Sequence, residues 1–308
     1  MQTSFDVLVA GEINPDLILS GDVEPVFGQV EKLVTSEELT IGSSSAIFAC
    51  GVARLGLHVA FIGKCGDDVF GRYMLNEMAK RGVDVGHVLV DQSGSTGVSV
   101  ILNRGTDRAI LTYLGLIPSM QVKDIPESLL VQSRHLHVAS YFLQEALQPD
   151  LADLFEHAHS LGLTTSLDTN YDPSEEWQGF DRLLKATNIF LPNEKEACSL
   201  AGTNSVESAL DMISKKVETL AIKLGARGAM GVSKGKRAFA DSLPIQVVDT
   251  VGAGDSFDAG FIFGYLQDWS FERTLKTAAI CGALSTRAAG GTAAQATLPE
   301  ILSLLETA

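Results

Sequence analysis

Hydrophobic and polar positions along the chain follow two alternating periodicities. Short runs rich in β-branched and other apolar residues predict strands at 5–10, 58–63, 98–103, 135–138, 164–168, 189–191 and 219–223. Longer stretches with helical spacing of apolar residues predict helices at 46–55, 72–81, 149–161, 206–216 and from 255 to about 266. Strands that alternate with helices are typical of a parallel sheet covered by helices on both faces.

Two segments interrupt this alternation. Residues 12–40 have an irregular pattern with several Pro and Gly residues, which predicts small strands outside the main core. Residues 95–115 contain two strand-like runs around turn residues near Gly105, which predicts a hairpin. We expect parts of both segments to form a small lid, inserted in a single domain that spans residues 1–308.

The composition is that of a globular protein with a strong negative charge. Hydrophobic residues make up 45% of the chain and charged residues 20%, which is enough apolar material for a buried sheet. The net charge of -15 argues against nucleic acid as a partner, because phosphate-backbone binding requires clustered Lys and Arg. An acidic protein that binds a polyphosphate must attract it locally, through backbone amides, a few cations and Mg²⁺.

Cysteine spacing and the N-terminal sequence exclude further classes. The four Cys residues lie far apart, which suggests neither a disulfide framework nor a zinc site. The first residues lack a basic region, and no uninterrupted apolar stretch is long enough to span a bilayer. The expected location is the cytoplasm, without membrane contact.

The most informative motif is Asp-Thr-Val-Gly-Ala-Gly-Asp at 249–255, followed by an apolar helical row. Gly252 and Gly254 permit a tight turn whose N–H groups point one way at the positive end of a helix dipole, where phosphate binds. A carboxylate beside bound polyphosphate is costly unless it accepts the proton of an attacking hydroxyl, so Asp255 indicates a phosphotransferase. We expect the helix dipole to keep Asp255 ionised. The alternative is that Asp255 merely caps the helix.

This motif resembles the second signature of the PfkB/ribokinase family of carbohydrate kinases, DTxGAGD. The resemblance implies a ribokinase-like three-layer α/β/α sandwich with a small β-sheet lid, which uses ATP and Mg²⁺. It also implies that Asp255 is the catalytic base and that the amides of Gly252, Ala253 and Gly254 form an anion hole. A less specific implication is that Asp249 and the backbone at Val251 belong to a loop that binds a monovalent cation, with K⁺ as the candidate.

Residues 41–71 resemble the family's first signature, which commonly contacts sugar hydroxyls. Gly42 is kept, but Ser43 stands where a second Gly is expected and Ile47 where the usual Asn would be. The resemblance implies that Gly42 and Ser43 contact the sugar, whereas the apolar side chain of Ile47 offers the sugar no hydrogen bond. A helix-capping loop at 43–45 is the alternative.

Four further residues are candidates for sugar binding. Asn14 and Asp16 follow the carboxyl end of the first predicted strand, where open α/β sheets bind ligands, and match the family's Asn-x-Asp element. A turn around Pro15 is the alternative. Asn103 and Arg108 lie in the predicted hairpin, and we expect them to contact the substrate from the lid. The alternative is that their side chains are only solvated.

Three elements resemble the family's nucleotide site. Asp168 and Asn170 match an Asp-x-Asn element near the phosphates, with an Asx-turn as the alternative. Asn193 and Glu196 match the NxxE element, in which Glu196 is associated with Mg²⁺ through water. The same pair also has the spacing of a helix capping box, and one pair can serve both purposes.

The third nucleotide element is the strand and turn at 222–228, which places Lys223, Gly225 and Gly228 near ATP. Its spacing is not GxGxxG, and no Walker Lys follows a GxxxxG, so a dinucleotide-binding oxidoreductase is poorly supported.

The predicted activity is transfer of the γ-phosphoryl group of MgATP to a primary hydroxyl of a sugar, of the ribose or fructose type. A nucleoside kinase of the same fold is the alternative if Ile47 and Phe48 line a pocket for a base. A sugar or nucleotide sensor without activity is the alternative from another class. In related kinases the lid often forms a dimer interface, so the resemblance implies a homodimer.

Overall fold

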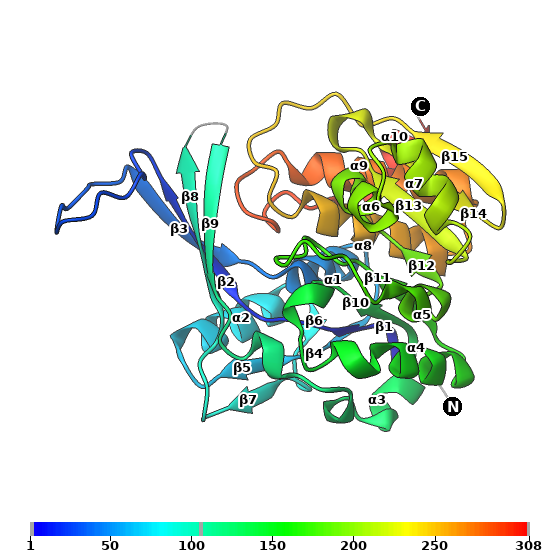
Figure 1. The fold of residues 1–308 in the computed structure, drawn as a ribbon, viewed down its shortest axis with the longest axis horizontal. Coiled ribbons are helices and arrows are strands. Elements are labelled where there is room, and N and C mark those ends of the chain that lie inside the picture. The colour runs from blue at the N-terminus through cyan, green and yellow to red at the C-terminus, as the bar shows by residue number, and fades with distance from the viewer. Residues whose placement is uncertain (1–2, 105–106, 307–308) are drawn as a thin grey trace.

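A nine-stranded sheet forms the centre of the computed structural model, which describes residues 3–104 and 107–306 (Figure 1). The strand order is β15-β14-β13-β12-β11-β10-β1-β4-β6. In chain order these strands are β1 (Phe5–Ala10), β4 (Val59–Ile62), β6 (Val83–Asp84), β10 (Ser133–Val138), β11 (Thr164–Leu167), β12 (Ile189–Phe190), β13 (Thr219–Lys223), β14 (Ala229–Ser233) and β15 (Lys236–Ala240).

The sheet is parallel from β6 to β13, and its last two strands are antiparallel. The sequence predicted the parallel strands except the short β6, and it missed β14 and β15. Lys234 and Gly235 join these two strands, and both have positive φ (49° and 76°). Such a two-residue turn matches the twist of an antiparallel pair.

Helices cover both faces of the sheet, and β1 shows how the two layers are separated. Val7 and Val9 belong to one hydrophobic cluster, while Leu8 and Ala10 belong to the other, because successive side chains of a strand point to opposite faces. The first cluster is shared with α1 (Ser44–Arg54), α2 (Val69–Lys80), α8 (Ala253–Leu266), α9 (Phe271–Ser285) and α10 (Leu298–Glu306). The second is shared with α3 (Glu127–Val131), α4 (Leu151–Ser160), α5 (Phe180–Lys185), α6 (Glu194–Ala201) and α7 (Val206–Ile213). The predicted three-layer α/β/α sandwich is confirmed.

A second sheet stands beside this body (Figure 1). It has four strands in the order β3-β2-β8-β9. They are β2 (Pro15–Ser20), β3 (Ser36–Ile41), β8 (Val98–Arg104) and β9 (Asp107–Tyr113). A short parallel pair, β5 (Lys64–Gly66) and β7 (Leu89–Asp91), lies at its base. The predicted turn near Gly105 lies outside the described residues.

Helix boundaries differ from the prediction where a polar side chain or a turn sets the start. The helix predicted at 72–81 begins at Val69, because the Asp68 carboxylate caps it by accepting a hydrogen bond from the Gly71 amide (2.8 Å). The helix predicted at 149–161 begins at Leu151, after a 3₁₀ turn. The helices α3, α5, α9 and α10 were not predicted. Among the described residues, no helix is both long enough and apolar enough to cross a membrane.

Close packing of α8 against α9 fixes the helix that carries Asp255. A Cβ atom on Gly260 would lie 2.6 Å from Cys281 Sγ and 3.1 Å from Ala278 Cα, and a Cβ on Gly264 would lie 3.0 Å from Thr274 Oγ1. These approaches are closer than side-chain packing normally allows. The two glycines therefore permit close helix packing.

We predict that Gly260→Ala lowers the free energy of unfolding by about 1–3 kcal/mol, because overpacking at α9 outweighs the better helix propensity of Ala. Urea unfolding of the purified protein measures this. The control is Ser208→Ala on the exposed face of α7, which should change stability little. Unchanged or increased stability of Gly260→Ala would contradict the packing role.

Candidate active site

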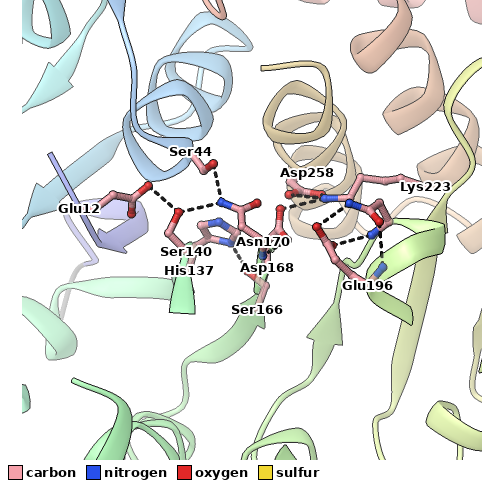
Figure 2. Close-up of polar contacts among 11 residues, drawn as sticks. Glu12, Ser44, His137, Ser140, Ser166, Asp168, Asn170, Glu196, Lys223 and Asp258 are labelled. Carbon is pink, nitrogen blue, oxygen red and sulfur yellow. Dashed lines mark hydrogen bonds and ion pairs between the residues drawn. The ribbon is translucent and has the colours of Figure 1, made fainter. Parts of the chain in front are cut away.

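Polar side chains from several strands meet at one edge of the central sheet. Glu12 follows β1, Ser140 follows β10, Asp168 follows β11, and Lys223 ends β13. The carboxyl ends of neighbouring parallel strands lie at the same edge, which is where open α/β sheets bind ligands. Figure 2 shows these side chains pointing toward one another across the edge.

The N-terminus of α8 carries the anion-binding turn predicted from the sequence. Gly252 is the N-cap with φ 70°, and a Cβ atom there would lie 2.6 Å from Gly291 Cα and 3.0 Å from Ile47 Cγ2. Only Gly satisfies both the backbone conformation and the space. The Ala253 amide donates a long hydrogen bond to the Thr250 carbonyl (3.3 Å), and the Gly254 amide, in the first turn, has no intrahelical acceptor. Asp255 lies in the first turn and is not the N-cap, so the capping alternative is wrong.

Three buried carboxyl groups lie together at this edge, and Lys223 contacts two of them. One oxygen each of Asp168, Asp255 and Asp258 lies within 4.8 Å of the others. Lys223 Nζ is 2.8 Å from Asp168 Oδ2 and 3.1 Å from Asp258 Oδ2. Burial alone would raise the pKa of Asp168, but the charge of Lys223 holds it below the ordinary value. Burial raises the pKa of Asp258 well above its ordinary value, despite the same lysine.

Asp255 is the carboxylate of this group that lies beside the anion-binding turn. Its side chain is buried, and burial, followed by the charge of Asp168, raises its pKa to about 8. The charge of Lys223 opposes this rise and that of Glu12 adds to it. This rise contradicts the expectation that Asp255 stays ionised, because burial and the neighbouring negative charges favour the protonated carboxyl group.

Asp168 and Asn170 form the Asx-turn that was the alternative to nucleotide contact. Asp168 Oδ1 accepts a hydrogen bond from the Asn170 amide (3.2 Å). The Asn170 side chain points between Ser44 and Ser140, at 2.6 and 2.7 Å from their hydroxyl oxygens. The predicted ATP contact of Asp168 and Asn170 stays a prediction.

Asn193 and Glu196 form the capping box of α6, as their spacing indicated. Asn193 Oδ1 accepts a hydrogen bond from the Glu196 amide (2.9 Å), and Glu196 Oε2 accepts one from the Asn193 amide (2.8 Å). The capping box holds the buried Glu196 carboxylate near Asp168. Burial and then the charge of Asp168 raise the pKa of Glu196 to about 7. The capping interpretation is confirmed, and the metal role remains open to test.

The predicted sugar-binding residues at the base of the second sheet lie together. Asn14 Nδ2 is 3.3 Å from Ser99 Oγ and 3.5 Å from Asp16 Oδ1. A Cβ atom on Gly42 would lie 2.2 Å from Asp16 Oδ1, so Gly is required for the carboxylate to fit. Burial raises the pKa of Asp16 to about 7, and the charge of Arg108 opposes the rise.

Ser43 caps the helix that follows it. Ser43 Oγ donates a hydrogen bond to the Glu12 carbonyl (2.6 Å) and accepts one from the Ala46 amide (3.1 Å), as the N-cap of α1. The capping alternative is thus confirmed for this hydroxyl, and a sugar contact would have to come from the Ser43 backbone. Phe48 is fully buried and stacks on His137 at 3.7 Å, while Ile47 packs against Gly291. Neither residue is placed to line a pocket for a base.

A cavity of about 520 Å³ lies between the second sheet and the loop before α8, and Asn103, Arg108, Asp249 and Val251 are among its lining residues. Arg108 Nη1 is 3.7 Å from Asp249 Oδ1. The Asp249 carboxylate also accepts hydrogen bonds from the amides of Val251 (3.1 Å) and Gly290 (3.0 Å). The structure thus brings the predicted lid residues to the predicted cation loop.

An apolar cleft of about 410 Å³ adjoins the anion-binding turn on its other side. Lys223, Gly225 and Gly228 line it together with Ala253 and Gly254. The cleft connects the predicted nucleotide turn to the N-terminus of α8. A larger cavity of about 870 Å³ opens at the amino edge of the sheet and shares no residue with this site, so size alone does not identify the functional cleft.

Four polar residues of the site were missed in the sequence: Glu12, Ser44, Ser140 and Asp258. Asp258 offered a signal, because it lies three residues after Asp255 and therefore on the same side of the helix. Glu12, like Asn14 and Asp16, follows the first strand. Ser140 offered no recognisable motif, since only the strand order brings it to the site.

Comparisons with known proteins agree with this geometry. The family described as "pfkB family carbohydrate kinase" matches residues 4–298. Ribokinase from Haemophilus influenzae is 29% identical to this chain, and the match covers 97% of this chain and 98% of that ribokinase. Fructokinase from Salmonella typhimurium is 30% identical, and the match covers 81% of this chain and 86% of that fructokinase. A putative ribokinase II from E. coli, solved in complex with ATP and Mg²⁺, superposes with a TM-score of 0.85 at 24% identity, covering 99% of this chain and 100% of its own.

The family match spans nearly the whole chain, and the superposition shows the same fold. Members of this family are phosphotransferases that act on sugar hydroxyls, which favours an enzyme over the sensor alternative. This chain belongs to the pfkB family of carbohydrate kinases.

Proposed function

We propose that this chain transfers the γ-phosphoryl group of MgATP to a primary hydroxyl of a sugar of the ribose or fructose type, with Asp255 as the general base. The observation that carries the proposal is the position of Asp255. A buried carboxylate with a raised pKa stands in the first turn of a helix whose N-terminal amides can bind an anion. A base with a pKa near the working pH is suited to proton transfer.

In the proposed reaction the sugar hydroxyl oxygen attacks the γ-phosphorus while Asp255 takes its proton, and ADP leaves. The amides of Gly252, Ala253 and Gly254 stabilise the negative charge on the transferred group. Lys223 adds a positive charge there, since its Nζ would lie only 3.5 Å from a Cβ atom on Gly254.

We place ATP in the 410 Å³ cleft, because this cleft ends at the anion-binding turn. Its walls of Leu243, Pro244 and Ile245 suit an adenine ring, and Gly225 and Gly228 lie at its rim. The phosphates would then point toward Gly254, with Asp168 and Asn193 beside them.

The buried carboxyl groups next to the anion-binding turn suit a divalent cation. Asp168, Asp258 and Glu196 supply three buried carboxyl groups, and carboxylate oxygens are the ligands that Mg²⁺ prefers. We propose that Glu196 holds Mg²⁺ through water. Bound Mg²⁺ would neutralise charge on the phosphates of ATP.

For a monovalent cation such as K⁺, Asp249 and the Val251 backbone are the proposed holders. This proposal rests on the resemblance of the 249–255 motif. Arg108 already supplies a positive charge 3.7 Å from Asp249.

We propose that Asn14, Asp16, Gly42 and Arg108 bind the sugar and that the four-stranded sheet is its lid within a single domain. Arg108 and Asn103 are cross-strand partners on the same side of the β8–β9 hairpin, and both line the cavity next to Asp249. Lid closure would exclude water from the transfer site.

The lid also carries the surface proposed for a homodimer. Phe27 and Leu33 are 96% and 84% exposed, and Leu111 and Tyr113 of β9 are exposed as well. Leu111 and Tyr113 lie two residues apart on one face of β9, and exposed apolar side chains that lie together mark an interaction surface.

We predict that Asp255→Asn lowers turnover by about 10²- to 10⁴-fold with ATP binding intact, because the variant cannot accept the proton. The assay measures ADP release from MgATP with a panel of pentoses, hexoses, keto-deoxy acids and nucleosides, and calorimetry measures ATP binding. Asp268→Asn, an exposed Asp→Asn change just beyond the other end of α8, is the matched control and should keep full turnover. Near-normal turnover by Asp255→Asn would exclude Asp255 as the base.

The pKa of Asp255 predicts the pH dependence of the reaction. The base works only when deprotonated, and burial raises its pKa to about 8, so kcat/KM should rise with pH and level off above about pH 8. Initial rates at low sugar concentration between about pH 5.5 and pH 9.5 measure this. A rate that is already flat across the acid half of this range would show that the acid limb does not belong to this carboxyl group.

For the dimer, we predict a mass twice the 32.8 kDa of one chain in light scattering after size exclusion, and a shift toward monomer in Leu111→Glu. The control is Met212→Glu, an exposed apolar residue of α7 that is far from the lid in the chain. A monomeric parent protein, or equal dimer content in both variants, contradicts the proposal.

A further inference from the structure

The side-chain amide of Asn170 lies next to two serine hydroxyls at the carboxyl edge of the sheet (Figure 2). Its Nδ2 donates to Ser44 Oγ (2.6 Å) and to Ser140 Oγ (2.7 Å), so both protons of the amide nitrogen are used. Ser44 is the first residue of α1, Ser140 follows β10, and Asn170 follows β11. The amide of Asn170 is therefore held from two separate elements.

Glu12 determines which end of this amide faces the serines. Its Oε1 accepts a hydrogen bond from the Ser45 amide (3.1 Å) and another from the Ser140 hydroxyl (2.8 Å). A hydroxyl has a single proton, so Ser140 Oγ can only accept from Asn170. The hydrogen-bond network thus requires the amide nitrogen of Asn170 on the serine side, and Oδ1 must point away from the serines.

The Oδ1 atom of Asn170 is left as an acceptor. In the part of the chain that the structure describes, no group donates a hydrogen bond to it. Asn170 is half-buried, and its Oδ1 is not sealed in the core, so a ligand can reach this atom. Figure 2 shows Asn170 between the serines and the cluster of Asp168, Asp258 and Lys223, which places the free side of the amide toward the proposed transfer site.

The backbone supports a role in ligand binding. Ser140 has φ 50° and Asn170 has φ 53°, both in the left-handed region. Residues other than Gly occupy this region rarely, Asn is among those that tolerate it, and such residues gather at functional sites. The chain therefore holds the amide in place through its backbone as well as through the serines.

An acceptor at this position excludes a phosphate oxygen as its partner, because two acceptors repel each other. The partner must be a donor, such as a sugar hydroxyl. The position agrees with a sugar: Ser44 lies two residues after Gly42, where a Cβ atom would be only 2.2 Å from Asp16 Oδ1. Among the described residues that line the cleft proposed for ATP, none is Asn170, Ser44 or Ser140.

We propose that Asn170 accepts a hydrogen bond from a non-reacting hydroxyl of the acceptor sugar and so selects the sugar, instead of binding a phosphate of ATP. This inference rests on the proposed function, in which Asp255 takes the proton of the reacting hydroxyl. Ser44 and Ser140 are positioning residues that keep Oδ1 turned toward the sugar. A sugar without the matching hydroxyl would leave this oxygen unpaired in the closed site, which lowers its kcat/KM.

The test combines sugar analogues with variants in steady-state kinetics with MgATP. Each non-reacting hydroxyl of the best sugar of the panel is replaced in turn by fluorine, which cannot donate a hydrogen bond. With the parent protein, one analogue should lose about 10- to 100-fold in kcat/KM relative to the sugar itself. In Asn170→Gly, which tolerates the positive φ, the sugar should lose about as much, the same analogue should lose nothing further, and the KM for ATP should stay within about twofold.

Ser140→Gly is the second variant, since it also tolerates a positive φ and removes a hydroxyl that holds the amide. It should weaken discrimination against the same analogue. The matched control is Asn204→Gly, an exposed Asn→Gly change between α6 and α7, which should keep the parent kcat/KM and the full discrimination.

Three results would overturn the inference while leaving the kinase activity in place. They are unchanged discrimination in Asn170→Gly, a raised KM for ATP with unchanged kcat/KM for the sugar, and a loss of apparent Mg²⁺ affinity alone. The second would make Asn170 a phosphate ligand, and the third would make it a ligand of metal-bound water. A parent protein that phosphorylates no sugar would instead overturn the proposed function.

Discussion

The ion pairs of the Lys223 ammonium group with Asp168 and Asp258 are the interaction on which the site depends. Carboxylates packed this closely repel one another, and a buried charge without a partner costs several kcal/mol. Lys223 holds the pKa of Asp168 below its ordinary value, so this carboxylate stays charged. Asp255 lies beside the same charges without a direct ion pair in the described part of the chain, and its pKa rises to about 8. Lys223 is thus paired with two other carboxyl groups and not with Asp255. Because the pKa of Asp255 is raised, this carboxyl group is able to accept a proton.

The fold brings these groups together through strand order. Residues far apart in the chain, such as Glu12, Ser140 and Lys223, each end or follow a strand of the same sheet, so their side chains share its carboxyl edge. In the layer of helices that contains α8, Gly252 lets this helix approach Gly291 and Ile47. This close approach places the anion-binding turn against the carboxyl edge of the sheet. The glycines at the α8–α9 contact keep that helix in place.

Much of this arrangement could be predicted from local sequence, and the rest depends on long-range contacts. The 249–255 motif predicted the turn and Asp255, and the spacing of Asn193 and Glu196 predicted the capping box, because both are local. The charge state of Asp255 could not be predicted, since it depends on burial and on Asp168, 87 positions earlier in the chain. Ser44 and Ser140 carried no motif for the same reason, and the departure at Ile47 proved to be core packing against Gly291.

Everything proposed for this site requires that phosphate binds at the N-terminus of α8, next to Asp255. The most direct test is a crystal structure with Mg²⁺ and a non-hydrolysable ATP analogue. We expect the γ-phosphate within hydrogen-bond distance of the Gly252–Gly254 amides, with the adenine in the cleft lined by Leu243 and Ile245. Phosphates that lie away from this turn, or an analogue bound in the cavity at the amino edge of the sheet, would contradict it.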